Sequence, residues 1–425
     1  MNSAYSLAIL AAILLVYALV SKRLASTFLT GPLLFVAFGL LMGSKVLGII
    51  QMESDPRTVD ILLEATLVLV LFGDAMAINA KAWRKEAYIP ERLLGIGLPF
   101  TIIFGFVAAL LLFGEFDIWE AALVGAILAP TDAALGQAVI SNPRVPLSVR
   151  HGLNVESGLN DGIVFPLVML LLAATLEAEG ASTTGNALWF IFKTIAISTV
   201  AGIAVGWIGG KLTVYCDRRS WLDSIWRQIA VLALAGLSYG LVTPFGGSGF
   251  ISAWVAGFTF GLVVRDRLAD ISDFPDALGQ LLVMISFFVF GNAILGQALG
   301  DMTWEVVLYA ALSLTVVRIV PVAVSMVRSG TKWPTVLYMG WFGPRGLASI
   351  VFAVIIIEEG DLLHIPLIIG VMAATVGMSV LAHGVTAWWG SNHYAAWYEG
   401  RSEEHHLMAE SKPVAAFVNR RRIQP

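Results

Sequence analysis

Charged residues are scarce in this 425-residue sequence, and cysteine is almost missing. Only 13% of the residues are charged, whereas a soluble protein usually has about 25%. The formal net charge of −4 excludes the strongly basic character of a nucleic-acid-binding protein. The single cysteine, Cys216, excludes a disulfide framework and a cysteine-ligated metal site. Apolar residues are abundant instead, at 58%, which is typical of a protein that crosses a membrane several times.

The apolar residues fall into thirteen runs that can cross a bilayer, which takes about 20 residues of helix. The runs cover residues 4–21, 28–48, 60–79, 93–113, 118–141, 151–176, 187–210, 225–243, 248–264, 277–299, 303–326, 333–357 and 364–388. No basic segment precedes the first run, so we expect a first membrane helix rather than a cleaved signal peptide. The sequence therefore predicts an all-α polytopic membrane protein.

Positive charge alternates from one loop to the next. Of the 26 lysines and arginines, 21 lie after odd-numbered runs or in the C-terminal tail, 3 lie on the other side and 2 lie within runs. Basic loops stay in the cytoplasm, so we expect the N-terminus outside and the C-terminus inside. The alternation also supports the number of runs, because one missed span would invert every later loop.

Two runs are interrupted by residues that break helices. The fifth contains Pro130-Thr131-Asp132, and the twelfth contains Gly343-Pro344-Arg345-Gly346. Because the two runs are seven apart, they cross the membrane in opposite directions. Paired interrupted spans of opposite direction indicate inverted repeats with a site at their crossing. We expect two six-helix repeats, spans 1–6 and 8–13, with spans 5 and 12 broken and crossing.

Three carboxyl groups, Asp132, Glu156 and Asp161, lie within the fifth and sixth runs. An acid in the hydrocarbon layer is costly and marks a functional site by default. Ser157 and Asp161 are four residues apart, as are Glu156 and Asn160, so each pair shares one side of a helix. At about 1.5 Å per residue, the three acids and the arginines of runs 11 and 12 fall between mid-membrane and the inner leaflet.

The oxygen atoms around the interrupted fifth run suit a hard cation. An unwound helix frees backbone carbonyls, and such carbonyls coordinate Na⁺ in membrane carriers. The predicted ligands of this cation are the carboxylates of Asp161 and Asp132, the Ser157 hydroxyl, and Thr131 through its backbone or hydroxyl. If a proton and a cation exclude each other at Asp161, alternating access exchanges the two ions.

The motifs resemble those of the cation:proton antiporter-1 family. PTDAALGQAV at residues 130–139 is followed by NVESGLNDG at residues 154–162, with Arg318 in run 11 and GPRG in run 12. Within that family the sequence resembles the bacterial NhaP-type sodium/proton antiporters, and the resemblance extends over nearly the whole chain. One departure is Ala133, where many members have proline after the Thr-Asp pair, and this leaves the ion selectivity open.

The resemblance implies a role for each residue of the second motif. Asp161 takes the position of the ion-binding aspartate, and Asn160 takes the position of a second aspartate in electrogenic relatives. Asparagine there implies electroneutral exchange of one proton for one monovalent cation. Glu156 matches a structural acid that pairs with an arginine of span 11, here Arg318.

The family also implies how the chain is divided. Residues 1–85 and 223–300 would form scaffold and dimerisation helices 1–3 and 8–10. Residues 86–180 and 301–390 would form core helices 4–6 and 11–13. Residues 181–222 would form the linking helix 7, and residues 391–425 a solvated cytoplasmic tail. The implied protein is a homodimer in the lipid bilayer of a bacterial cell membrane, serves pH homeostasis, and has no cofactor.

Several alternatives stay open at this point. The transported cation is expected to be Na⁺, with Li⁺ or K⁺ possible, so a K⁺/H⁺ antiporter with the same residues is one alternative. A cation channel is another, although crossing broken helices favour alternating access over a continuous pore. An intramembrane aspartyl enzyme using Asp132 and Asp161 is a third, but it has no use for a Glu156–Arg318 pair.

Three residues near the site have more than one interpretation. Asp132 either binds the ion or caps the broken helix by accepting hydrogen bonds from free backbone amides. Arg345, with Pro130 and Pro344, is expected to stabilise the broken helices, either by holding freed carbonyls of span 12 or by repelling cations from a wrong path. Asp74, about two turns from the cytoplasmic end of span 3, could line an inner funnel.

Overall fold

The computed structural model describes residues 3–24, 27–50, 56–78, 88–178, 187–264, 271–300, 302–359, 362–401 and 408–411. These residues form helices, turns and loops, without a strand in any of the described ranges. Each of the thirteen predicted runs contains at least one helix. Within these described ranges, eight helices are long and apolar enough to cross a membrane, and shorter apolar helices lie in several of the other runs. The predicted all-α polytopic fold is confirmed.

The first seven runs correspond to a series of helices that ends before residue 220. Their bounds are α1 (Ser3–Leu24), α2 (Gly31–Met42), α3 (Pro56–Ala77), α5 (Tyr88–Arg92), η2 (Leu93–Gly97), α6 (Leu98–Leu112), α7 (Ile118–Ile127), α8 (Gln137–Ile140), α9 (Leu147–Ala178) and α10 (Ala187–Arg218). The fifth run is divided between α7 and α8, as its proline predicts. A capping box of Asp117 and Glu120 begins α7.

The remaining six runs form the second series. Their bounds are α11 (Ser224–Val242), η3 (Thr243–Phe245), α12 (Gly249–Val264), α13 (Asp273–Val289), η4 (Phe290–Leu295), α14 (Gly296–Ala298), α15 (Trp304–Leu314), α16 (Val316–Ser325), α17 (Trp333–Trp341), α18 (Leu347–Glu359), α19 (Ile365–Glu399) and η6 (Ala409–Ser411). The twelfth run is divided between α17 and α18. The last long helix ends at Glu399, further along the chain than the predicted end at residue 388.

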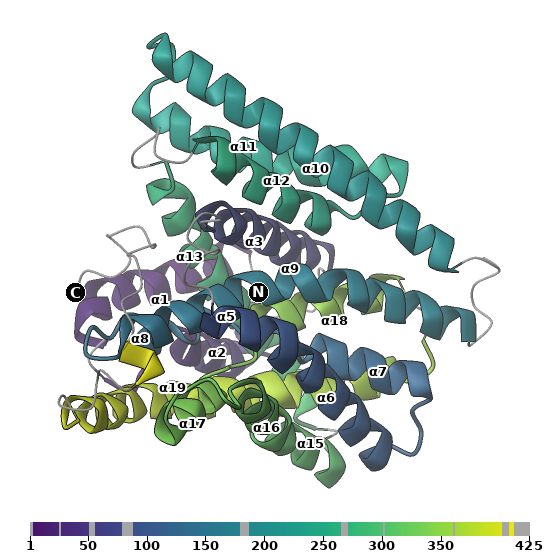
Figure 1. Ribbon diagram of the computed structural model, residues 1–425. Helices are drawn as coiled ribbons and strands as arrows, with labels where there is room; N and C mark the ends of the chain where they lie inside the picture. The colour runs from purple at the N-terminus through teal and green to yellow at the C-terminus, as the bar shows by residue number, and fades with distance from the viewer. Residues whose placement is uncertain are drawn as a thin grey trace.

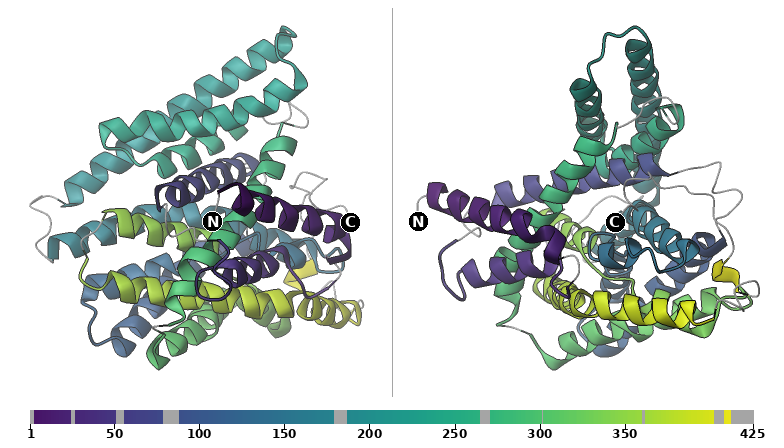
Figure 2. Two further views of the ribbon diagram at one scale, coloured as in Figure 1. Left: turned by 180° about the vertical axis from the view of Figure 1, so that it is seen from behind. Right: turned by 90° about the vertical axis from the view of Figure 1, so that its left-hand side faces the viewer.

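The helices form two groups that meet along α3 and α9. Helices α10, α11 and α12 stand apart as an outer layer in Figures 1 and 2, and α12 packs on α3. Helices α6, α7 and α15 to α19 lie on the opposite side. Helix α9 contacts α3, α7, α10, α12 and α18, so it runs between the two groups. A side chain on α9 is therefore placed where the groups meet.

Glycines allow α12 and α3 to approach closely. A Cβ atom at Gly257 would contact the backbone of Phe72, and one at Gly261 would contact the backbone of Met76. Small residues at such spacing let helix backbones touch in a membrane. The two glycines are four residues apart, so the outer layer is held against α3 over about one helical turn.

A π-helical segment, η4, interrupts the α-helix of the tenth run where a polar side chain is buried. Asn292 in this segment donates from its Nδ2 atom to the carbonyl oxygens of Gly39, at 3.2 Å, and Ile50, at 3.1 Å. Gly39 lies in the last turn of α2, and Ile50 lies in the non-helical segment that follows α2. Asn292 therefore joins the π-helical segment to α2 and to the segment that follows α2.

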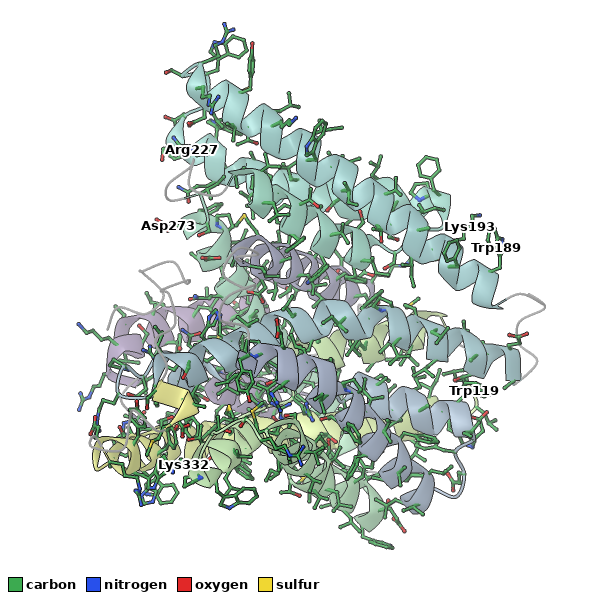
Figure 3. The ribbon with its side chains drawn as sticks, in the orientation of Figure 1. Trp119, Trp189, Lys193, Arg227, Asp273 and Lys332 are labelled. Carbon is green, nitrogen blue, oxygen red and sulfur yellow. The ribbon has the colours of Figure 1, made fainter. Side chains whose placement is uncertain are left out.

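Residues from alternate loops of the predicted topology lie toward opposite ends of the bundle. Figure 3 shows Arg227 and Lys332 at one end, and Trp119, Trp189 and Lys193 at the other. This separation agrees with the alternation of loop charge in the sequence. Which end faces the cytoplasm stays a prediction.

Candidate functional site

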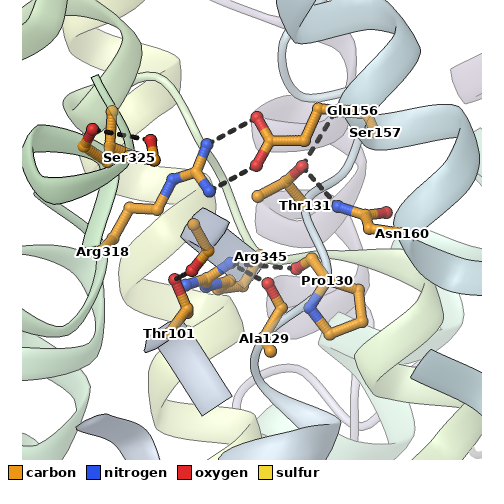
Figure 4. A network of polar contacts seen from close by, with 12 residues as sticks. Thr101, Ala129, Pro130, Thr131, Glu156, Ser157, Asn160, Arg318, Ser325 and Arg345 are labelled. Carbon is orange, nitrogen blue, oxygen red and sulfur yellow. Dashed lines mark hydrogen bonds and ion pairs between the residues drawn. The ribbon is translucent and has the colours of Figure 1, made fainter. Parts of the chain in front are cut away.

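The break in the fifth run leaves backbone carbonyls without helical partners. Helix α7 ends at Ile127, and Pro130 cannot continue it because proline has no N–H group. The carbonyl oxygens of Ala129 and Pro130 instead accept hydrogen bonds from Nη1 of Arg345, the latter at 3.2 Å. The Arg345 side chain is fully buried. Figure 4 shows this guanidinium reaching from the second broken helix to the first.

Asp132 connects the two breaks in the other direction. Its Oδ1 atom accepts hydrogen bonds from the backbone N–H groups of Ala134, at 2.7 Å, and Leu135, at 3.1 Å. Its Oδ2 atom accepts from the N–H of Leu347, the first residue of α18, at 2.7 Å. Its own N–H donates to the Pro344 carbonyl at 2.8 Å. The carboxylate therefore caps α18 and the turn that follows the break.

These contacts show which groups Arg345 and Asp132 bind within the protein. They do not test whether either residue binds an ion. Arg345 holds freed carbonyls, but they belong to span 5 and not to span 12. The span-12 interpretation missed this because a guanidinium on a long side chain reaches across the crossing. Asp132 makes the capping contacts that the sequence left open. Because Oδ1 accepts two of the three N–H donors, the remaining acceptor site of the carboxylate is on Oδ2.

The absence of a side chain at Gly346 leaves room for the Asp132 carboxylate beside the break between α17 and α18. A Cβ atom at position 346 would contact the Oδ2, Cγ and Cβ atoms of Asp132. We expect Gly346→Ala to lower the stability of the solubilised protein by about 1–3 kcal/mol, as overpacking does. Thermal unfolding in detergent would measure the loss. Gly370→Ala is the matched control, because a Cβ there would contact nothing within 4 Å, and equal melting of both variants would contradict the prediction.

The hydroxyl of Thr131 forms hydrogen bonds with two side chains of α9. Its Oγ1 atom lies 3.0 Å from the Ser157 hydroxyl and accepts a hydrogen bond from Nδ2 of Asn160 at 2.8 Å. All three side chains are buried. Figure 4 shows the group beside the unwound backbone at Pro130. The break is thereby fastened to the middle of α9.

Glu156 and Arg318 form a buried, two-point ion pair. The guanidinium of Arg318, on α16, donates to the two carboxylate oxygens at 2.5 and 2.7 Å, and each side chain is 1% exposed. Figure 4 shows the pair on the other side of Thr131 from Asn160. The geometry is the bidentate arrangement typical of strong arginine–carboxylate pairs. Glu156 thus has its charge neutralised within the protein.

Two oxygen atoms at the site have no donor among the described residues. They are Oδ1 of Asn160 and Oδ1 of Asp161, both buried. An unsatisfied buried acceptor costs free energy, more so when it is charged. A proton on Asp161, or a hard cation shared by these oxygens, would remove the cost. Asp161 differs in this respect from Asp132 and Glu156, whose oxygens have partners.

A cavity lies beside the first part of α9, before Asp161 in the chain. Its volume is about 130 Å³, and its lining includes Asp74, Gln137, His151 and Asn154. Asp74 lies against the next turn of α9, since a Cβ at Gly158 would be 3.4 Å from the Cβ of Asp74. Polar groups therefore extend from the cavity to within one helical turn of Asp161.

Two residues of α19 support the second break, and the sequence analysis gave them no role at the site. The Ser379 hydroxyl accepts a hydrogen bond from the backbone N–H of Arg345 at 2.7 Å. His383 is buried, and its Nε2 atom lies 2.8 Å from the carbonyl oxygen of Trp341, the last residue of α17. Both stand on a continuous helix without breakers, so no sequence signal marks them.

Known proteins are similar to this chain in sequence and in fold. The family described as "Sodium/hydrogen exchanger, transmembrane" matches residues 9–389. A K⁺/H⁺ antiporter NhaP of Alkalimonas amylolytica is 25% identical over 80% of this chain, and a probable Na⁺/H⁺ antiporter of Schizosaccharomyces pombe is 25% identical over 76%. The matches cover 58% and 45% of those two relatives. The chain thus spans less than two thirds of their length.

A solved structure extends the comparison to three dimensions. The sodium proton antiporter MjNhaP1 of Methanocaldococcus jannaschii at pH 8 aligns with a TM-score of 0.76 and 22% identity. The alignment covers 93% of this chain and 99% of that structure. The two chains therefore share one fold over nearly their entire length.

Proposed function

This chain belongs to the sodium/hydrogen exchanger family, and from that premise we propose that it is a secondary antiporter that exchanges a monovalent cation for a proton. The observation that carries the proposal is the buried Oδ1 atom of Asp161, which has no donor among the described residues. The atom lies on α9 beside the broken helices. A transporter rather than an enzyme fits this arrangement, because the carboxylate needs a small ion and no bound cofactor.

The charges at the crossing support electroneutral exchange. Arg318 and Arg345 contribute two positive charges, and Glu156, Asp132 and Asp161 contribute three negative charges when all are ionised. The group therefore has one negative charge in excess when Asp161 is ionised and empty. One proton or one monovalent cation at Asp161 neutralises it equally. Desolvation disfavours the empty, charged state, so the core moves across the membrane in either loaded form.

The order of events follows from the cavity and the break. A cation or a proton enters through the cavity beside Asp74 and reaches Asp161. Thr131 and Ser157 supply hydroxyl oxygens near the break, and Asn160 supplies its free Oδ1. Binding of one ion excludes the other, because both neutralise the same carboxylate. Movement of the core then exposes the site to the opposite side.

We propose Na⁺ as the transported cation, with Li⁺ and K⁺ as the alternatives that the same site permits. The relative from Alkalimonas amylolytica is a K⁺/H⁺ antiporter and the structural relative is a sodium proton antiporter, so similarity favours neither ion over the other. The oxygen ligands suit any hard monovalent cation.

Proteoliposomes containing a pH-sensitive dye test the proposal. Na⁺, Li⁺ and K⁺ are added in turn to wild-type protein, without and with a clamped membrane potential. At least one cation should dissipate the pH gradient, at a rate that does not change under the clamp. A wild-type protein that moves no protons against any of the three ions would overturn the proposal.

A second acid at position 160 should change the stoichiometry. In Asn160→Asp the site gains a charge that a proton can neutralise but that one monovalent cation cannot. The proton-loaded and cation-loaded forms then differ by one charge, and each cycle moves net charge across the membrane. We expect exchange by this variant to depend on the clamped potential. Asn160→Ser, which keeps the site charge, is the control, and potential dependence in both variants would refute the argument.

The proposal also includes a bacterial cell membrane, an N-terminus outside, and a homodimer. The separation of Arg227 and Lys332 from Lys193 supports the orientation. Labelling single cysteines from outside intact cells would test it, since a cysteine at position 193 should react and one at position 332 should not. Mass photometry of the solubilised protein would report the oligomeric state.

A further inference from the structure

One turn near the C-terminus, residues 408–411, is buried against the first turns of α9 and α17. Met408 is 2% exposed and Glu410 is 1% exposed. The sequence suggests a solvated tail from residue 391 onward, and these residues differ from that expectation. A buried carboxylate so far outside the ion site needs partners that repay its loss of water. Its contacts show which parts of the protein it connects.

Glu410 caps a helix that belongs to another part of the chain. Its Oε1 atom accepts hydrogen bonds from the Thr335 hydroxyl at 2.6 Å and from the backbone N–H of Lys332 at 3.2 Å. Lys332 is the N-cap residue of α17, and it supplies no side-chain cap of its own. Free N–H groups and the positive end of the helix dipole favour a carboxylate at this position. Glu410 therefore completes the start of the second broken helix.

The same turn also contacts two continuous helices of the core. The Ser148 hydroxyl, in the first turn of α9, donates to the backbone carbonyl of Glu410. The Ser411 hydroxyl lies 2.9 Å from the hydroxyl of Tyr398 on α19. The N–H of Ala409 donates to the carbonyl of Gly330, just before α17, at 3.3 Å. One turn thus joins the ends of α9, α17 and α19.

These helices are the ones that build the ion site. Asp161 lies 13 residues beyond Ser148 on α9, roughly 20 Å along the helix. Helix α17 leads into the break at Pro344, whose carbonyl accepts the N–H of Asp132. A clamp between the ends of α9 and α17 therefore sets how the two repeats meet at the crossing.

We propose that Glu410 is a positioning residue for transport, and that residues 408–411 brace the core by fastening α9 to α17. The effect on transport rests on the proposed antiport function, whereas the docking of the turn does not. Glu410 acts through hydrogen bonds accepted by its Oε1 atom. A glutamine keeps that acceptor and an alanine removes it.

Cysteine labelling of the full-length protein tests docking without transport. Met408→Cys is made in a Cys216→Ser background, and the rate of maleimide reaction is measured with Glu410, Glu410→Gln or Glu410→Ala. We expect about tenfold faster labelling with alanine, as hydrogen bonds to a charged group are lost, and a rate near that of Glu410 with glutamine. Equal rates for Glu410 and alanine would overturn the role of Glu410 in docking.

Exchange in proteoliposomes, per mole of monodisperse protein, tests positioning. We expect Glu410→Ala to lower the maximal rate by about fivefold, while the half-saturating cation concentration stays unchanged because Asp161 is distant. Glu410→Gln should restore the rate. If Glu410→Ala is labelled faster but exchanges cations at an unchanged or higher rate, Glu410 is not a positioning residue for transport. If wild-type protein exchanges no cation, the antiport function fails, while the labelling result still decides whether the turn docks.

Discussion

Asp161→Asn is expected to abolish exchange of every cation while leaving the protein folded. The amide has nearly the shape of the carboxyl group but can carry neither an exchangeable proton nor the negative charge that holds a cation. The Oδ1 atom of Asp161 has no donor in the described part of the chain, so the replacement breaks no hydrogen bond to that atom. The pH gradient in proteoliposomes should decay no faster than in protein-free vesicles.

The control for this experiment removes the same charge elsewhere. Glu115 lies exposed in the loop before α7, and Glu115→Gln should exchange at the wild-type rate. The thermal unfolding of Asp161→Asn should match or exceed that of wild type, since an unsatisfied buried acid is removed. Exchange by Asp161→Asn at more than half the wild-type rate would place the ion at another residue.

Breaking the pair between Glu156 and Arg318 is expected to cause the largest loss of stability. Glu156→Gln leaves the guanidinium without its counter-charge, and Arg318→Met leaves the carboxylate alone. Removing one partner of a buried ion pair costs about 3–5 kcal/mol, because the other charge stays desolvated. Thermal unfolding in detergent should shift down by about 3–6 °C in either single variant.

The double variant Glu156→Gln with Arg318→Met distinguishes the contribution of charge pairing to stability from the contribution of side-chain packing. If each single loss comes from an unpaired charge, the double variant recovers part of the stability, and the two effects are not additive. Disrupting the exposed pair of Arg144 and Glu399, which is 2.7 Å apart at the surface, is the matched control and should change melting little. Additive losses in the double variant would show that packing and not charge dominates.

The sequence predicted the fold well because hydropathy and loop charge are local signals. A run of apolar residues identifies a helix without knowledge of its neighbours, and each predicted run contains a helix. Helix breakers are local in the same way, and Pro130 and Pro344 lie where helices end. The π-helical segment Phe290–Leu295 illustrates the limit, because it differs from an α-helix in its hydrogen-bond register and not in its hydropathy.

Contacts between the two repeats could not be predicted in the same way. Arg345 forms hydrogen bonds with carbonyls 215 and 216 residues earlier in the chain. No pattern in either segment indicates that the two segments are in contact. The family resemblance supplied the pairing of Glu156 with Arg318, which spacing alone could not. Glu410 was missed for a related reason, since a short polar segment at the end of a chain is usually solvated.

The crossed bonding of the two breaks affects how the protein is made. The carbonyls of Ala129 and Pro130 are satisfied by Arg345, and the N–H of Asp132 by Pro344. At 5–20 residues per second, synthesis of the intervening 215 residues takes roughly 10–40 s. During that interval the first repeat is in the membrane with polar backbone groups that its partner has not yet reached. Until the second repeat has been synthesised, water, lipid headgroups or the insertion machinery must therefore form hydrogen bonds to these backbone groups.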